Sequence, residues 1–231
     1  MTFNATCEDN MALMARYPDK FFDLAIVDPP YGSGQDWSKE KMNKGRYKGN
    51  YDNSLIPNSA YFEELFRVSK NWIIWGANYY TAYLVPTNNI IVWDKKAPQN
   101  NIESMGEIAY TSFKHPLRII EIEWSGARKG ILESTTKKIH PHQKPVALYK
   151  WLLANYAKPG DKILDTHLGS GSIAIACYDL GFDLTACELD PYYFKVMMKR
   201  YTDHVKSRPI IPGMEYVVVE SVKQMKMFDT D

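Results

Sequence analysis

Short apolar runs alternate with segments of helical spacing along most of the chain. Residues 58–68 carry apolar side chains at helical intervals, with Asn58 or Ser59 as the expected cap, and Pro191 is placed to open a helix as a first-turn proline. Strands are expected at 23–28, 72–75, 90–93, 162–165 and 184–187, and helices at 58–68, 146–157, 172–180 and from 191 onward. This alternation predicts an α/β fold with a mostly parallel sheet and helices on both faces.

Composition and charge narrow the class of protein. The chain has 231 residues, 45% of them apolar, and 28 Lys and Arg against 27 Asp and Glu. Those values are typical of a folded protein and exclude a generally polycationic nucleic-acid coat. An odd count of 3 cysteines, the absence of an apolar run of about 20 residues and the lack of a signal-peptide pattern indicate a cytoplasmic protein. We expect one catalytic domain over 1–231, with a short polar insert at 112–139.

A glycine turn lies between two predicted strands. Gly169 and Gly171 let the backbone approach a ligand closely, because neither has a Cβ. Glu188 follows at the end of the next strand, where a carboxylate can accept hydrogen bonds from both hydroxyls of a ribose. The pattern favours an adenosine-type cofactor. A nicotinamide or flavin remains open because Ala174 completes a loose dinucleotide motif, and so does a tight turn with an unrelated surface acid.

The segment Asp28-Pro29-Pro30-Tyr31 directly follows a predicted buried strand. Two prolines fix the backbone and remove two N–H donors, so the turn presents carbonyl oxygens beside a carboxylate and an aromatic ring. If Asp28 and the Pro29 carbonyl each accept one hydrogen of an exocyclic amine on a planar base, the nitrogen lone pair can localise toward an electrophile. Tyr31 can stack on that base. The alternative is an Asx-type turn with an exposed tyrosine.

Together these motifs resemble the amino-methylating DNA methyltransferases that use S-adenosylmethionine, and more narrowly the adenine-N6 group with β-type motif order. The catalytic tetrapeptide comes first in that order and the cofactor half closes the chain. The matching segments are Asp28 to Tyr31, His140 to Pro145 (family His-Pro-Thr-Gln-Lys-Pro), Asp165 to Ser172 (family Asp-Pro-Phe-x-Gly-Ser-Gly-Thr), Cys187 to Asp190 and Glu8 to Asn10.

The resemblance implies a Rossmann-like methyltransferase fold with permuted motif order, and it assigns roles to residues. It makes 112–139 the target-recognition segment and Lys144 the partner of the cofactor's methionine carboxylate. Asp28, Pro29, Pro30 and Tyr31 are then the catalytic residues. The cofactor-binding residues are Asp9, Gln143, Lys144, Asp165, His167, Gly169, Gly171, Ser172 and Glu188. The chain departs from the family at His142, Thr166 and His167, where Thr, Pro and Phe are usual.

DNA is the expected partner, and a homodimer is allowed. A locally basic segment follows Tyr31, and Lys44, Arg46 and Lys48 are expected to contact phosphates. A second basic stretch runs from Lys114 to Lys150; solvated loops are the alternative for both. The histidines lack metal-ligand spacing, so no metal site is predicted.

Other functions remain open at this point. Asp at the first position of the tetrapeptide favours adenine, while cytosine-N4 methylation, a catalytically inactive nucleic-acid-binding relative and a nicotinamide-dependent oxidoreductase are the alternatives. Residues 75–80, which are rich in aromatic side chains, could shape a base pocket or belong to the core.

Overall fold

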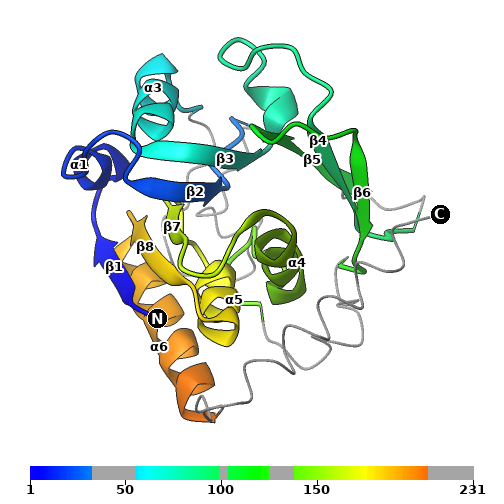
Figure 1. The fold of residues 1–231 in the computed structure, drawn as a ribbon. Helices are drawn as coiled ribbons and strands as arrows, with labels where there is room; N and C mark the ends of the chain where they lie inside the picture. Colours follow the sequence, from blue (N-terminus) through cyan, green and yellow to red (C-terminus); the bar gives the residue numbers. More distant parts are fainter. Residues whose placement is uncertain (33–55, 99–103, 125–137, 208–231) are drawn as a thin grey trace.

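A computed structural model describes residues 1–32, 56–98, 104–124 and 138–207 of the chain. Within them, eight strands form one sheet in the order β1-β8-β7-β2-β3-β5-β4-β6 (Figure 1). The strands are β1 (Phe3–Cys7), β2 (Phe22–Val27), β3 (Ser69–Trp75), β4 (Ile90–Asp94), β5 (Gly106–Thr111), β6 (Arg118–Glu121), β7 (Lys162–Asp165) and β8 (Asp183–Glu188). The helices are α1 (Asn10–Met14), α3 (Ser59–Val68), the 3-10 turn η1 (Ala77–Tyr79), α4 (Val146–Tyr156), α5 (Ser172–Leu180) and α6 (Pro191–Ser207).

The sheet is mostly parallel, as predicted. Strands β1, β8, β7, β2 and β3 run parallel to one another, and β6 is parallel to β4. Only β5 among the described strands is antiparallel to both of its neighbours, β3 and β4. β2 lies between β3 and β7, so a strand from the first half of the chain borders one from the second. The predicted α/β fold is confirmed.

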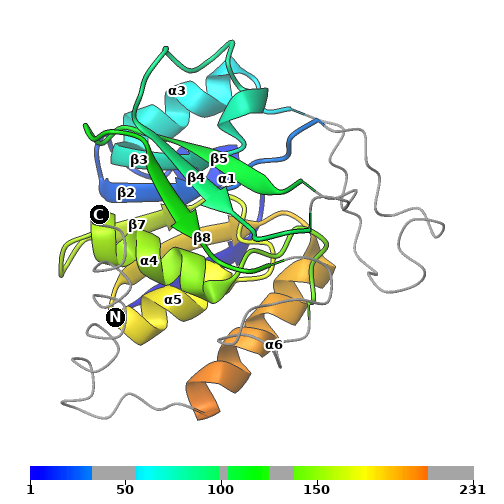
Figure 2. The ribbon, with the colours of Figure 1, turned by 90° about the vertical axis from the view of Figure 1, so that its right-hand side faces the viewer.

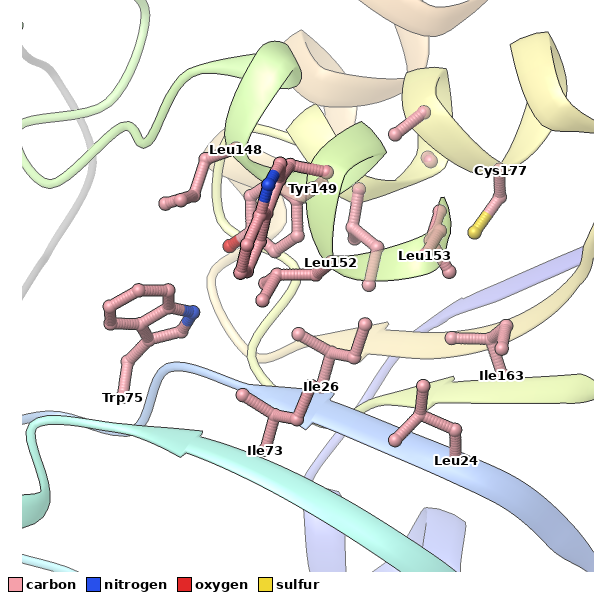
Figure 3. Close-up of a cluster of buried hydrophobic side chains, with 14 of the residues drawn as sticks. Leu24, Ile26, Ile73, Trp75, Leu148, Tyr149, Leu152, Leu153, Ile163 and Cys177 are labelled. Carbon is pink, nitrogen blue, oxygen red and sulfur yellow. The ribbon is translucent and has the colours of Figure 1, made fainter. Parts of the chain in front are cut away.

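Helices cover both faces of the sheet (Figures 1 and 2). Alternate residues of β2 point to opposite faces, as a strand requires. Leu24 and Ile26 pack in the cluster that holds α4, α5 and part of α6, and Figure 3 shows them on the side of the sheet that faces Leu152 and Leu153 of α4. Ala25 and Val27 pack with the buried side chains of α1 and α3 on the other face. β2 is therefore buried on both faces, and this packing holds its carboxyl end, which precedes Asp28, in a defined position in the sheet.

Three parts of the chain differ from, or add to, the sequence-based expectations. Strands β1 and β5 and helix α1 were not predicted. The predicted insert at 112–139 is not wholly separate from the sheet, because β6 lies inside it and pairs with β4. Residues 125–137 of that range lie outside the described residues, and the role of the insert in target recognition stays a prediction. No helix in the described ranges has the length and apolar character to cross a membrane.

Candidate active site

The predicted catalytic and cofactor segments follow neighbouring parallel strands. Asp28 comes directly after β2, the glycine turn begins after Asp165 at the end of β7, and Glu188 ends β8. Asp9 follows β1 and caps α1, with its Oδ1 accepting the backbone N–H of Met11 at 2.8 Å. Because β1, β8, β7 and β2 are parallel, their carboxyl ends lie at one edge of the sheet, where open α/β sheets bind ligands.

Asp28 belongs to a buried cluster of two carboxylates and two ammonium groups. Its Oδ1 accepts a hydrogen bond from the Tyr31 hydroxyl, and its Oδ2 lies 2.5 Å from Lys144 Nζ. The same Lys144 Nζ lies 2.9 Å from Glu107 Oε2, and Glu107 Oε1 lies 2.6 Å from Lys95 Nζ. We call Asp28, Lys144, Glu107 and Lys95 the charge cluster. Its formal charges balance, which a buried set of ions requires.

The two carboxyls of the charge cluster differ in acidity. Burial raises the pKa of Asp28 above its ordinary value; Lys144 opposes that rise and the negative charge of Glu107 adds to it. Burial also acts to raise the pKa of Glu107, but Lys144 and Lys95 together outweigh it and lower that pKa to about 2. Lys144 is buried, which favours its neutral form, yet its two carboxylate partners raise its pKa and keep it charged. Glu107 is thus the firmly ionised carboxyl and Asp28 the more basic one.

Tyr31 is held between the charge cluster and a neighbouring tyrosine. Its ring stacks on Tyr79 with centroids 4.9 Å apart and an interplanar angle of 6°. Gly76 lies against it: a Cβ at that position would be 2.3 Å from Tyr31 Cε1, and φ at Gly76 is +76°. Tyr79 is 46% exposed, so the stack is open to solvent on its outer side. The aromatic residue that we predict to stack on a base already stacks on a tyrosine here.

The two proline carbonyls share one hydroxyl donor. Tyr80 is fully buried, and its hydroxyl lies 2.7 Å from the Pro29 oxygen and 2.9 Å from the Pro30 oxygen. A carbonyl oxygen has two lone pairs, so Pro29 can accept a second hydrogen bond. Tyr80 lies in the aromatic segment 75–80, for which the sequence left a base pocket or the core open. Its ring is in the core, and its hydroxyl hydrogen-bonds to the proline turn. Glu107, by contrast, carried no sequence signal.

The glycine turn requires both of its glycines. Gly169 has φ +50° and Gly171 has φ +70°, the left-handed region that glycine tolerates best. A Cβ at Gly171 would also lie 2.4 Å from Met197 Cγ. Glu188 Oε2 accepts the Gly169 N–H at 2.7 Å, so the predicted ribose acid is tied directly to the turn. Burial raises the pKa of Glu188.

The two unusual residues of the turn form one hydrogen-bonded chain. His167 Nε2 lies 3.0 Å from Asn10 Nδ2, and His167 Nδ1 lies 2.9 Å from Thr166 Oγ1, which is 2.7 Å from the Tyr61 hydroxyl. Burial lowers the pKa of His167 to about 3, so its ring is neutral. Burial also raises the pKa of Asp165 to about 8, although its Oδ1 accepts the His167 N–H at 2.9 Å. Thr166 and His167, the two polar residues that replace the family's Pro and Phe, are therefore hydrogen-bonded to each other.

Two predicted cofactor contacts also have partners within the protein. The Lys144 ammonium group faces Asp28 and Glu107, and its pairing with a cofactor carboxylate stays a prediction. Ser172 Oγ donates to the Lys144 carbonyl at 2.7 Å and lies 3.0 Å from an Arg200 nitrogen. Ser172 therefore joins the glycine turn to the segment before α4.

Gln143 behaves differently. Its Oε1 accepts the Ile139 N–H at 2.9 Å, while its buried Nε2 finds no acceptor within the described part of the chain. A buried donor without a partner is uncommon in proteins, and an acceptor on a bound ligand would satisfy it. The residues at this edge thus suit an adenosine-type group: a carboxylate on β8, two glycines in the turn and an unused amide donor.

The predicted DNA-contacting residues Lys44, Arg46 and Lys48 lie outside the described residues. Within the second basic stretch, Lys144 belongs to the charge cluster and Lys150 lies 2.6 Å from Asp179. These two ammonium groups are paired with carboxylates of the protein, and phosphate binding by the rest of the stretch stays a prediction. The described ranges bring together no group of three or more His, Cys, Asp or Glu that could hold a metal ion.

Sequence comparison identifies relatives of one kind. The family model described as DNA methylase matches residues 58–199, a range that begins after the Asp28–Tyr31 segment. The Type II methyltransferase M.HpaI of Haemophilus parainfluenzae is 21% identical, over 84% of this chain and 72% of that protein. The Type II methyltransferase M2.DpnII of Streptococcus pneumoniae is 27% identical, over 83% of this chain and 87% of that protein.

Solved structures share the fold. The crystal structure of an M1.HpyAVI–SAM complex has a TM-score of 0.56 and 16% identity, covering 86% of this chain and 100% of that one. The PvuII DNA methyltransferase, described as cytosine-N4-specific, has a TM-score of 0.59 and 11% identity, covering 97% of this chain and 93% of that one. These likenesses agree with the Rossmann-like methyltransferase fold that the motifs implied.

Proposed function

The chain belongs to the DNA methylase family, and we propose that it transfers a methyl group from S-adenosylmethionine to the N6 amine of an adenine flipped out of DNA. One observation carries the proposal: the acceptor-rich turn after β2 and the glycine turn after β7 follow adjacent parallel strands. The relatives named as Type II methyltransferases support it. The family match favours this reaction over the nicotinamide-dependent alternative.

Asp28 and the Pro29 carbonyl prepare the amine. An aromatic amine is a poor nucleophile because its lone pair is delocalised into the ring. When Asp28 and the Pro29 oxygen accept its two hydrogens, the lone pair localises on nitrogen, and the acceptors stabilise the positive charge that develops there. S-adenosylmethionine, when bound, supplies an electrophilic methyl group. The methyl–sulfur bond of the cofactor would break as the amine takes the methyl group, and S-adenosylhomocysteine would leave. One N–H proton of the methylated amine passes to the Asp28 carboxylate, whose raised pKa suits it to accept that proton.

The cofactor is proposed to lie along the edge formed by β1, β8 and β7. Glu188 would accept hydrogen bonds from the ribose hydroxyls, and the glycine turn would allow the backbone close to the ligand. Gln143 Nε2 offers the unused donor. Asp9, Asp165 and His167 lie around the same strand ends and stay predicted cofactor contacts.

DNA is the proposed partner and the prokaryotic or phage-infected cytoplasm the proposed location, while a homodimer stays a prediction. Tyr31 is proposed to stack on the extruded base, which requires that the base replace Tyr79 or add to the stack on another side. Adenine is preferred because the tetrapeptide begins with Asp28. Cytosine-N4 methylation is the second candidate, because the PvuII enzyme shares the fold.

The test is a direct product analysis. The protein is incubated with plasmid DNA and isotope-labelled S-adenosylmethionine, and the digested nucleosides are separated by chromatography with mass detection. We expect N6-methyladenine from the unchanged protein and no product from Asp28→Ala, with cofactor affinity retained in calorimetry. Asp203→Ala, in an exposed ion pair on α6, is the matched control and should stay active. Full activity of Asp28→Ala would refute the mechanism, and N4-methylcytosine would change the assigned base.

The DNA-contact prediction has its own test. Lys44, Arg46 and Lys48 changed together to alanine should weaken DNA binding and flatten its dependence on salt, since fewer counterions are released. Cofactor binding should survive. Unchanged DNA affinity at low salt would remove these residues from the interface.

A further inference from the structure

Glu107 is a buried acid that no motif assigns. It lies in β5, opposite Trp93 of β4, and its side chain is 19% exposed. Its Oε2 lies 2.9 Å from Lys144 Nζ and 3.3 Å from the Tyr31 hydroxyl. Both of those groups also contact Asp28. Glu107 therefore touches the catalytic carboxylate's two partners without occupying the amine-binding turn itself.

The two carboxylates share ammonium groups unequally. Lys144 contacts both Asp28 and Glu107, at 2.5 and 2.9 Å, while Lys95 adds a second ion pair to Glu107 at 2.6 Å. The side chains of Lys144 and Lys95 are only 4% and 15% exposed, so solvent screens these interactions weakly. Because the negative charge of Glu107 offsets part of the positive charge of Lys144, Lys144 lowers the pKa of Asp28 less than it would alone. A carboxylate with a higher pKa is a better hydrogen-bond acceptor for an incoming N–H.

We propose that Glu107 is a positioning residue for methyl transfer: anchored by Lys95, it divides the charge of Lys144 and thereby keeps Asp28 a strong acceptor and base for the target amine. This inference rests on the proposed function. Glu107 would have no contact with DNA or cofactor and would act through Lys144 and Tyr31.

The pH dependence of the site shows the effect directly. The rate should fall on the acidic side as Asp28 becomes protonated, so the acid limb of kcat/KM follows the pKa of Asp28 in the free enzyme. The groups that interact with Asp28 are Lys144, Glu107, Tyr31, Tyr61, Tyr149 and Asp165. The unchanged protein and each variant share all of these groups except the substituted residue. A difference between their acid limbs therefore reports the effect of that substitution on the pKa of Asp28.

Two substitutions should move that limb in opposite directions. Glu107→Gln removes the negative charge and leaves Lys144 to Asp28 alone, so the pKa of Asp28 falls and the acid limb shifts down by about 1 pH unit. Lys95→Met leaves Glu107 dependent on Lys144, so the pKa of Asp28 rises and the limb shifts up. In Glu107→Gln, where Asp28 becomes the weaker base, kcat should fall while cofactor affinity is retained. Glu121→Gln, in an exposed ion pair with Lys96, is the control and should leave the limb in place.

The experiment measures methyl transfer against pH for the full chain and these variants, together with the Asp28 carboxyl pKa by carbon-13 NMR, assigned with Asp28→Asn. Opposite shifts of the limb support the inference, whereas unmoved limbs or shifts in one direction overturn it. If Glu107→Gln fails to fold, Lys95→Met decides alone. A protein that methylates no base, yet shows opposite NMR shifts, would fail the proposed function while retaining the charge coupling.

Discussion

Replacing Lys144 by methionine is expected to destabilise the protein by about 3–5 kcal/mol near pH 7. The Lys144 side chain is 4% exposed and its ammonium group contacts both Asp28 and Glu107. Methionine has a similar length and fills the space, so the loss reports the charge. Removing the shared cation leaves two buried carboxylates with Lys95 alone, and that uncompensated charge sets the magnitude.

The loss should depend on pH in a defined direction. The pKa of Asp28 lies above its ordinary value through burial, and without Lys144 it would rise further. A carboxyl whose pKa is higher in the folded than in the unfolded protein contributes stability below its unfolded pKa, and that stability is lost as the pH rises through the folded pKa. Lys144→Met should therefore lose less stability at pH 5, where Asp28 can take up a proton, than at pH 8.

Urea unfolding followed by tryptophan fluorescence, at pH 5 and pH 8, measures both quantities. The control is Lys199→Met, because Lys199 pairs with Asp203 in a bridge whose side chains are 75% and 58% exposed. It should change stability by less than about 1 kcal/mol. A loss for Lys144→Met that equals the control, or that is greater at pH 5 than at pH 8, would show that the charge cluster does not carry the electrostatics argued for it.

Three other substitutions test separate parts of the site. Tyr80→Phe removes the hydroxyl that holds both proline carbonyls and should slow single-turnover methyl transfer about tenfold, at unchanged cofactor affinity. Gly171→Ala should lower the urea midpoint more than Gly181→Ala. Both glycines have positive φ, but only a Cβ at Gly171 would collide with Met197. Equal decreases would show that the collision with Met197 adds no cost. Asp165→Asn should flatten the decline in stability between about pH 4 and pH 8, because burial raises the pKa of Asp165 from 3.8 to about 8; an unchanged slope would contradict this.

Hydrophobic patterning was sufficient for the elements that pack on a full core. β2 has apolar side chains on both faces, so its run stands out, and α3 begins after Asn58, whose side chain accepts the Tyr61 N–H at 3.2 Å as expected of a cap. β6 was not predicted because Ile120 is its one buried residue, and the exposed Arg118 and Ile119 give the segment the pattern of a loop. Edge strands of this kind are specified by pairing with a neighbour more than by their own pattern.

The sequence motifs predicted which segments form the site, but they did not predict which charged side chains contact Asp28. Spacing along the chain places Asp28 and Glu188 at strand ends, because parallel strands share a carboxyl edge. It contains no information on which buried charge faces Asp28, since Glu107 arrives on the antiparallel strand β5 and Lys144 from the segment before α4. A motif-based role for Lys144 therefore missed its two carboxylate partners.

The order of the motifs along the chain matters little for the site, because the pairing of strands in the sheet decides which motifs lie side by side. β2 pairs with β7 through Leu24↔Ile163, so the Asp28 turn lies beside the glycine turn although it precedes that turn by more than half the chain. Lys144 then joins them a second time: its ammonium group contacts Asp28, and its carbonyl accepts the Ser172 hydroxyl at the start of α5. Lys144 therefore connects the Asp28 turn to the start of α5 through both its side chain and its backbone.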